Sequence, residues 1–441
     1  MTMTLRQLQA CWLKVFKANR AKEKVRRLLG SRFVKSTSLL VGSTAISQVL
    51  GIAVLPLLTR LYSPEDFSVY AVFSAVLALI TVVSCLRFEI AIPLPEEQVE
   101  ARSLIILSLL SSIFVAIVVL VIIVFWGKQI HLFTQGRLVG YLWILPVAGL
   151  LSGFYSTFQY WATRERDFML LSKTRVAQAL SGAGAQVGLG YVGITPFGLL
   201  VGQVLNVSAG ALSLARECFR ADRNAKIQIS RAQLQATFKA YENFPKYSTF
   251  EALCNSAAIQ LPLLLIAAYA IGPEVGFLML AMRLLSAPMS LIGKSVAQVY
   301  LSEAPAYHQR SELKQFTLKV IWSLSKLGLL PALAAGVGAP FIVPFVFGGG
   351  WERTGILIAW LTPCFFMQFL SAPVSMSLHI TGNQKAALVL QVFGFFVRVG
   401  SVLLCGFYHE RYVAEVYAIS GLFFYAFYML VIIKVLKSCE R

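Results

Sequence analysis

Several polar residues lie inside apolar stretches at spacings that would bring them together on a helix. Ser248, Glu251 and Asn255 are three and four residues apart, so a helix would place them on one face. A charge at the centre of a bilayer costs roughly 2.5–3.5 kcal/mol on insertion scales, so we expect this face to line a water-filled cavity. Glu251 would then either pair with a cation or bind and release a proton. We favour the pair, because ion pairs are the commoner reason for such a carboxylate.

Basic residues inside apolar stretches are a second group of candidates. Arg283 and Lys294 share one stretch, and no Asp or Glu occurs between residues 276 and 301. Arg398 lies in a later stretch, and Gln368 begins a polar face that continues at residues 371, 375 and 379. Cations without acidic neighbours favour an anionic ligand, although a long basic side chain near a helix end can also extend to the membrane surface.

Arg87 and Glu89 are a third group, within the segment Leu86–Pro95. These two residues either pair with each other or extend to the interface, or they form the charged rim of a substrate path. Catalytic patterns are absent from the sequence: we find no glycine-rich nucleotide motif, no Ser/His/Asp constellation and no metal-ligand spacing. The seven cysteines are scattered without a CxxC pair. We therefore expect that the protein is not an enzyme and that it binds neither a metal nor a cofactor.

The elements that position these residues are membrane helices. Hydrophobic residues make up 57 % of the 441 residues and charged residues 13 %, with a mean hydropathy of +0.71. A helix crosses a bilayer with about 20 apolar residues. Twelve such runs are predicted, at residues 38–60, 67–87, 103–126, 138–162, 169–192, 196–216, 247–270, 276–301, 318–347, 354–380, 386–408 and 412–434. The predicted fold is an all-α integral membrane protein with two six-helix lobes around a central cavity.

The net charge of +19 follows the membrane topology. The first 35 residues contain ten Lys and Arg, and the long polar segment in the middle of the chain is also basic. If both segments are cytoplasmic, few basic residues remain on the other side, which is the positive-inside pattern. Both termini are then predicted to be cytoplasmic, and the basic charge does not require nucleic acid.

The pattern divides the chain into five parts. These are a basic amphipathic tail (1–35), a first lobe (36–217), a cytoplasmic linker (218–246), a second lobe (247–436) and a short cytoplasmic tail (437–441). The first tail is either a helix on the anionic inner leaflet or a solvated segment. An offset of 209 residues relates the turn at Pro64 to that at Pro273, which predicts two parallel repeats.

Three segments resemble one family of transporters. The segments Ser47–Phe67, Leu86–Pro95 and Asn243–Ser248 resemble the first helix and its turn, the end of the second helix, and the start of the seventh helix. The family is that of bacterial O-antigen and polysaccharide flippases (Wzx type) in the multidrug/oligosaccharidyl-lipid/polysaccharide (MOP) exporter superfamily.

The resemblance implies a flippase for an undecaprenyl-diphosphate-linked oligosaccharide repeat unit, used in O-antigen (lipopolysaccharide), capsule or exopolysaccharide synthesis. It would sit in the inner membrane among membrane lipids, alternate between two openings, and act with a polysaccharide polymerase and chain-length proteins. Arg283 and Lys294 best fit the cationic cavity of the family. Coupling to a proton or sodium gradient would rest on Glu251 or Glu89.

Two other functions remain open. A multidrug/cation antiporter of the same superfamily would need acidic cavity residues, whereas this sequence offers mainly basic ones. A membrane glycosyltransferase or glycan polymerase would need a catalytic carboxylate pair or a large outer loop, and the sequence contains neither.

Overall fold

The computed structural model describes residues 32–138, 140–223, 229–270 and 272–438. The amphipathic tail helix predicted near Leu5–Phe16 lies outside these residues. All regular secondary structure in the described part is helical. The elements are α2 (Arg32–Ala53), α3 (Leu55–Leu61), α4 (Pro64–Val83), α5 (Phe88–Ala91), α6 (Gln98–Phe133), α7 (Ile144–Arg164), α8 (Phe168–Tyr191), α9 (Phe197–Ser208), α10 (Ala211–Arg223), α11 (Arg231–Ala240), η1 (Phe244–Ser248), α12 (Thr249–Tyr269), α13 (Glu274–Gln309), α14 (Leu313–Phe347), η2 (Gly349–Trp351), α15 (Glu352–Val374), α16 (Ser377–Ile380), α17 (Gln384–Tyr408), η3 (Glu410–Tyr412) and α18 (Val413–Ser438).

A helix lies over each of the twelve predicted apolar runs. Nine helical segments of the described chain are long and apolar enough to cross a membrane, so the chain is a multi-pass membrane protein. The three predicted runs outside this group of nine are those of α7, α8 and α13. One of these, α8, carries Arg175, Gln178 and Gln186, which line the cavity described below and lower the mean hydropathy of the helix.

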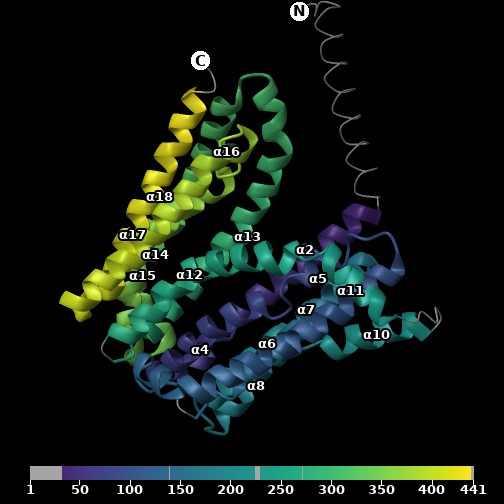
Figure 1. Ribbon diagram of the computed structural model, residues 1–441. Coiled ribbons are helices and arrows are strands. Elements are labelled where there is room, and N and C mark those ends of the chain that lie inside the picture. The colour runs from purple at the N-terminus through teal and green to yellow at the C-terminus, as the bar shows by residue number, and fades with distance from the viewer. Residues whose placement is uncertain (1–31, 139, 224–228, 271, 439–441) are drawn as a thin grey trace, which may run out of the picture.

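The helices form two arms that diverge from a common end (Figure 1). The first arm contains α2 to α11, and the second contains α13 to α18. α12 packs on α4 of the first arm and on α17 of the second, and α13 also packs on α4. We call the common end the closed end. The arms diverge toward the start of α2 and the end of α18, which we call the open end.

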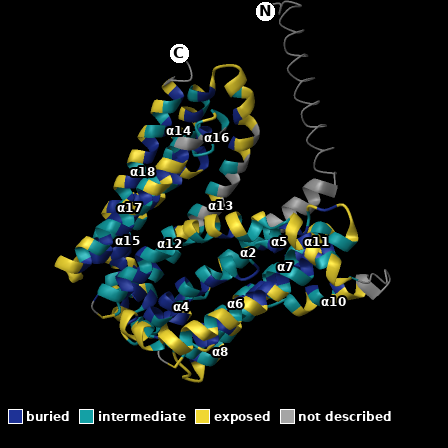
Figure 2. Ribbon diagram, viewed as in Figure 1, coloured by how far each residue is buried: buried dark blue, intermediate teal, exposed yellow. Residues whose placement is uncertain are grey.

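Large apolar side chains cover the outside of the arms. Phe125 on α6 is 72 % exposed and Phe345 on α14 is 87 % exposed. Figure 2 shows exposed residues along the outer helices, with buried residues concentrated between the helices of each arm. Soluble proteins rarely expose such continuous apolar surface, whereas a bilayer solvates it. This pattern fits a protein surrounded by lipid.

The closed end is formed by the short turn before α4 and by segments of the second arm. Ser63 caps α4: its hydroxyl accepts a hydrogen bond from the Asp66 backbone (3.2 Å), and the Asp66 carboxylate accepts one from the Ser63 backbone (2.9 Å). The indole nitrogen of Trp351 donates to the carbonyl oxygen of Thr59 (3.1 Å), and its ring packs edge-on against Phe67 at 4.8 Å. The two contacts of Trp351 join the arms.

Gly276 allows the arms to approach closely at this end. Its backbone amide donates to the Ser68 hydroxyl (3.1 Å), and a Cβ atom at this position would lie 2.3 Å from the carbonyl oxygen of Pro64. Arg137, in the loop after α6, donates to the carbonyl oxygens of Ala267 and Gly272. The turns at residues 64 and 273, which the predicted repeat relates, therefore lie at the same end of the molecule and touch.

We expect the replacement Gly276→Val to force the closed end apart, because the Pro64 carbonyl is backbone and cannot rotate away. A cysteine at Thr59, which is 6 % exposed, should then react several-fold faster with a membrane-impermeant maleimide. The matched control is Gly188→Val, since an added Cβ at Gly188 meets no atom within 4 Å. Equal labelling of both variants would contradict the importance of this contact.

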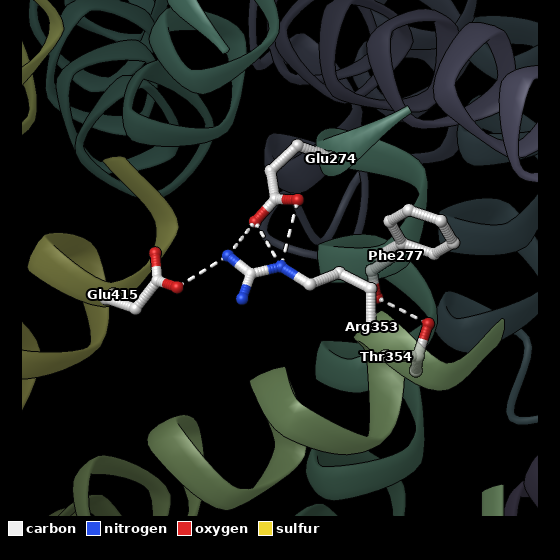
Figure 3. A network of polar contacts seen from close by, with 5 residues as sticks. All are labelled: Glu274, Phe277, Arg353, Thr354 and Glu415. Atoms are coloured by element: carbon white, nitrogen blue, oxygen red, sulfur yellow. Dashed lines mark hydrogen bonds and ion pairs between the residues drawn. The ribbon is translucent and has the colours of Figure 1, made fainter. Parts of the chain in front are cut away.

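An ion network fastens the closed end of the second arm (Figure 3). The Arg353 guanidinium on α15 donates to both carboxylate oxygens of Glu274 on α13, at 2.6–3.1 Å, and to Glu415 on α18 at 2.5 Å. The side chains of Glu274 and Glu415 are only 14 % and 10 % exposed. One partly buried cation thus holds three helices together, two residues after the inter-arm contact of Trp351.

Candidate functional site: two polar chambers between the arms

A polar cavity of about 400 Å³ lies between the two arms. We call it the arginine chamber. Helices α2, α8 and α9 of the first arm form most of its wall, and α13 of the second arm closes it. Its lining residues are Thr44, Ser47, Gln48, Gly51, Ile52, Val54, Arg175, Gln178, Ala179, Ala183, Gln186, Gln203, Asn206, Arg283, Ser286 and Ala287.

Arg175 is held at the chamber wall by the packing of α8 on α2. Its guanidinium donates to the Thr44 hydroxyl at 2.6 Å, and the Ser47 hydroxyl donates to its backbone carbonyl at 3.1 Å. Small hydroxyl residues on α2 allow this close approach and supply the hydrogen bonds. The remaining guanidinium donors of Arg175 can reach a ligand in the chamber.

Arg283 reaches the same chamber from the second arm. Its guanidinium donates to the Tyr70 hydroxyl at 3.2 Å and lies 6.0 Å from the centre of the Tyr70 ring. Tyr70 in turn donates to the Gln203 side chain at 2.8 Å, which fixes the orientation of the ring. A Cβ at Gly51 would lie 3.8 Å from Arg283, so the glycine leaves room for the guanidinium.

The electrostatics of the arginine chamber favour an anion. Two guanidinium groups line it, and no Asp or Glu is among the described residues of its wall. Arginine remains charged and presents a planar array of donors that matches phosphate oxygens. The neutral lining residues include five amide side chains, which can bind further oxygen atoms.

A second cavity, of about 390 Å³, lies in the second arm and is lined by aromatic residues. We call it the aromatic chamber. Arg398 on α17 donates to the Gly394 carbonyl at 3.1 Å, and its guanidinium carbon lies 4.9 Å from the Phe424 ring centre. The lining residues are Asn255, Ala258, Ile259, Met282, Ser286, Cys364, Phe365, Gln368, Ser371, Ala372, Ser375, Gln391, Arg398, Tyr417, Gly421, Phe424, Tyr425 and Tyr428. Ser286 lines both chambers, so they adjoin on α13.

The structure distributes the predicted site residues over several places. Arg283 lines the arginine chamber, whereas Asn255, Gln368 and Arg398 line the aromatic chamber. The side chain of Lys294 lies outside the described part of the structure, although its backbone belongs to α13. The roles of these residues in substrate binding stay predictions.

Glu251 and Asn255 do not share one environment. Glu251 is exposed near the start of α12, lines neither chamber and makes no ion pair within the described residues. The two residues are four apart on α12 and share a face, but Glu251 is one turn closer to the helix start, whereas Ser248 belongs to the preceding π-helical turn η1. The pairing of Glu251 stays a prediction.

Arg87 and Glu89 lie in the first arm, away from both chambers. Arg87 has a left-handed backbone (φ +65°) at the turn between α4 and α5. Glu89 is 5 % exposed, and one of its carboxylate oxygens has no hydrogen-bond partner in the described structure. The two residues make no ion pair within the described residues, and they flank Phe88, which belongs to a buried cluster with Trp161.

Sequence reasoning missed Arg175, Gln178 and Gln203. Arg175 lies inside the predicted run 169–192, close to a segment of mixed charge, and was not singled out as a site residue; α8 begins at Phe168 and places it two turns inside the helix. The spacing of Arg175, Gln178 and Gln186 was a usable signal, because positions three and eleven residues apart recur on one helix face.

Comparison with known proteins identifies the fold first. The structure is similar to a lipid II flippase, MurJ, in an inward closed conformation, with a TM-score of 0.68 and 14 % identity over 91 % of this chain and 90 % of that chain. It is also similar to a multidrug resistance MATE family transporter of the MOP superfamily in an inward-facing conformation, with a TM-score of 0.59 and 15 % identity over 90 % of this chain and 95 % of that chain. The chain therefore has the fold of MOP transporters.

The family follows from the sequence. The model of a polysaccharide biosynthesis protein family matches residues 57–355, more than half of the chain, and the chain belongs to that family. No curated protein matches the sequence. The chain is therefore a member of a polysaccharide biosynthesis protein family whose fold is similar to those of MurJ and of a MATE transporter. The predicted resemblance to a polysaccharide family with the fold of MOP transporters is confirmed.

Proposed function

We propose that the protein translocates an undecaprenyl-diphosphate-linked oligosaccharide repeat unit across the bacterial inner membrane, for O-antigen, capsule or exopolysaccharide synthesis. The observation that carries this proposal is the arginine chamber, where Arg175 and Arg283 meet without an acidic residue among the described lining. A diphosphate carries negative charge that hydrocarbon cannot solvate, and a glycan carries many hydroxyl groups. A cationic, amide-lined chamber replaces that solvation while the polyprenyl chain stays in lipid.

The direction of opening agrees with this cargo. Under the positive-inside rule the basic segments, including Arg216, Arg220 and Arg231, are cytoplasmic, and these segments lie on α10 and α11 at the open end (Figure 1). The proposed topology has twelve spans, both termini in the cytoplasm, and two lobes joined by the linker 218–246. Such a molecule is open toward the side on which lipid-linked precursors are made, and it would load its cargo there.

Transport by alternating access then requires the closed end to separate and the open end to close. The driving force is proposed to be a proton or sodium gradient. Glu89 is the better placed of the two predicted carboxylates, because it is buried with one unpartnered oxygen, whereas Glu251 is exposed. The polysaccharide polymerase and chain-length proteins remain proposed partners.

A transport assay in liposomes tests this proposal. The purified full-length protein is reconstituted with the lipid-linked oligosaccharide that accumulates in a strain lacking the gene, and a membrane-impermeant lectin reports its appearance on the opposite leaflet. We expect protein-dependent translocation, and accumulation of the same lipid on the inner leaflet of the deletion strain. Protein-dependent efflux of an organic cation such as ethidium, with no movement of the oligosaccharide, would overturn the proposal in favour of an antiporter.

A further inference from the structure

The two chambers differ in chemistry, although they adjoin at Ser286. The arginine chamber has two guanidinium groups, and no aromatic ring is among its described lining residues. The aromatic chamber has one guanidinium group and the rings of Phe365, Tyr417, Phe424, Tyr425 and Tyr428. Neighbouring cavities with such different walls are suited to different parts of one ligand.

The walls of the aromatic chamber suit a sugar ring. A pyranose has apolar faces of C–H groups and an edge of hydroxyl groups, and aromatic side chains supply flat apolar contact. Gln368, Gln391 and Asn255 place amide groups in the same wall, and Ser371 adds a hydroxyl. An amide both donates and accepts hydrogen bonds, as a sugar hydroxyl requires. Ligand sites commonly combine mostly apolar walls with a few such polar groups.

Arg398 adds a charge that a neutral sugar would not need. The described residues that line the aromatic chamber include no Asp, Glu, Lys or His, and Arg398 makes no ion pair within the described structure. Its Nε–H is used by the Gly394 carbonyl and one face of the guanidinium lies toward Phe424, which leaves the terminal N–H groups to bind a ligand. A charge inside a membrane protein is costly without a partner, and this one faces a cavity.

We propose that the aromatic chamber binds a sugar that carries an anionic group, such as the carboxylate of a uronic acid, with Arg398 as its recognition residue. This inference rests on the proposed function and deepens it: the diphosphate would occupy the arginine chamber, while an acidic sugar of the repeat unit occupies the aromatic chamber. The transporter would then select acidic over neutral glycans by a carboxylate–guanidinium contact, which is bidentate at its best.

Binding measurements on the detergent-solubilised full-length protein test this assignment. The probes are a uronic-acid-containing trisaccharide, its carboxyl-reduced neutral counterpart, and undecaprenyl diphosphate without sugar. We expect the wild type to bind the acidic trisaccharide roughly tenfold or more tightly than the reduced one, because a hydrogen bond to a charged group is lost on reduction. Arg398→Gln should remove this difference, and Arg283→Gln should retain it.

Undecaprenyl diphosphate separates the two proposals. We expect Arg283→Gln to weaken its binding and Arg398→Gln to leave it unchanged, which also shows that the Arg398 variant is folded. If undecaprenyl diphosphate does not bind the wild type, the proposed function fails, whatever the trisaccharides do. If the wild type binds both trisaccharides equally, or if Arg398→Gln weakens diphosphate binding instead, the acidic-sugar assignment is overturned. Should Arg398→Gln fail to accumulate, the wild-type comparison and Arg398→Lys, which should keep the preference, decide the question.

Discussion

The double replacement Arg175→Gln/Arg283→Gln is expected to reduce translocation of the lipid-linked oligosaccharide by about 100-fold or more. Hydrogen bonds from a charged group contribute about 1.5–3 kcal/mol each, which corresponds to roughly 10- to 150-fold per residue. Glutamine keeps hydrogen-bonding capacity and most of the volume, so the change is mainly one of charge. The measurement is the initial rate in liposomes at matched protein content.

The control for this experiment removes two cations that do not line a chamber. Lys173 on α8 and Lys319 on α14 are exposed, so Lys173→Gln/Lys319→Gln lowers the net charge equally without touching the site. We expect this variant to retain nearly all activity. A full rate in the arginine double variant, with the control also active, would mean that the chamber does not bind the diphosphate.

The replacement Arg353→Met is expected to destabilise the protein by about 3–5 kcal/mol, because it leaves two mostly buried carboxylates without their cation. The protein should accumulate poorly in the membrane and unfold at a distinctly lower temperature in detergent. Arg60, which is exposed on α3, supplies the matched control as Arg60→Met, for which we expect little change.

A compensating variant separates the charge effect from loss of packing. The triple variant Arg353→Met/Glu274→Gln/Glu415→Gln removes the cation and both carboxylates together, so it should recover most of the lost stability. Replacement of a whole buried ion network by neutral groups is often close to neutral. An Arg353→Met protein as stable as the wild type would show that the network contributes little.

The helical membrane architecture could be predicted because it depends on local sequence. A continuous apolar run of about 20 residues has few alternatives to a membrane helix. The position of Arg283 in a polar cavity could be predicted on similar grounds, since a cation without an acidic neighbour within its own span has to face something other than lipid. The structure confirms the all-helical membrane fold, and it places Arg283 at the arginine chamber.

The network of Glu274, Arg353 and Glu415 could not be predicted, because its members are 79 and 62 residues apart and form no local pattern. The split between Glu251 and Asn255 was hidden for a different reason. Both residues lie on α12, one helical turn apart, and only the packing of α15, α17 and α18 makes the aromatic chamber include Asn255 and end before Glu251. Arg175 was missed because hydropathy places it inside the run 169–192 but does not show that its helix packs on α2 and α9 to form a cavity.

Beside the ring contact of Trp351 with Phe67, three contacts that join the arms at the closed end share one property. Trp351 binds the carbonyl of Thr59, Arg137 binds the carbonyls of Ala267 and Gly272, and Gly276 packs against the carbonyl of Pro64. In each contact one partner is a peptide group, which every residue type possesses. When the residue that supplies the side chain is substituted, no change of residue type at the peptide partner is needed or able to compensate. Among homologues, these three contacts should leave solitary invariant positions and not covarying pairs, so methods that infer contacts from covariation would underestimate the contact between the two arms in this conformation.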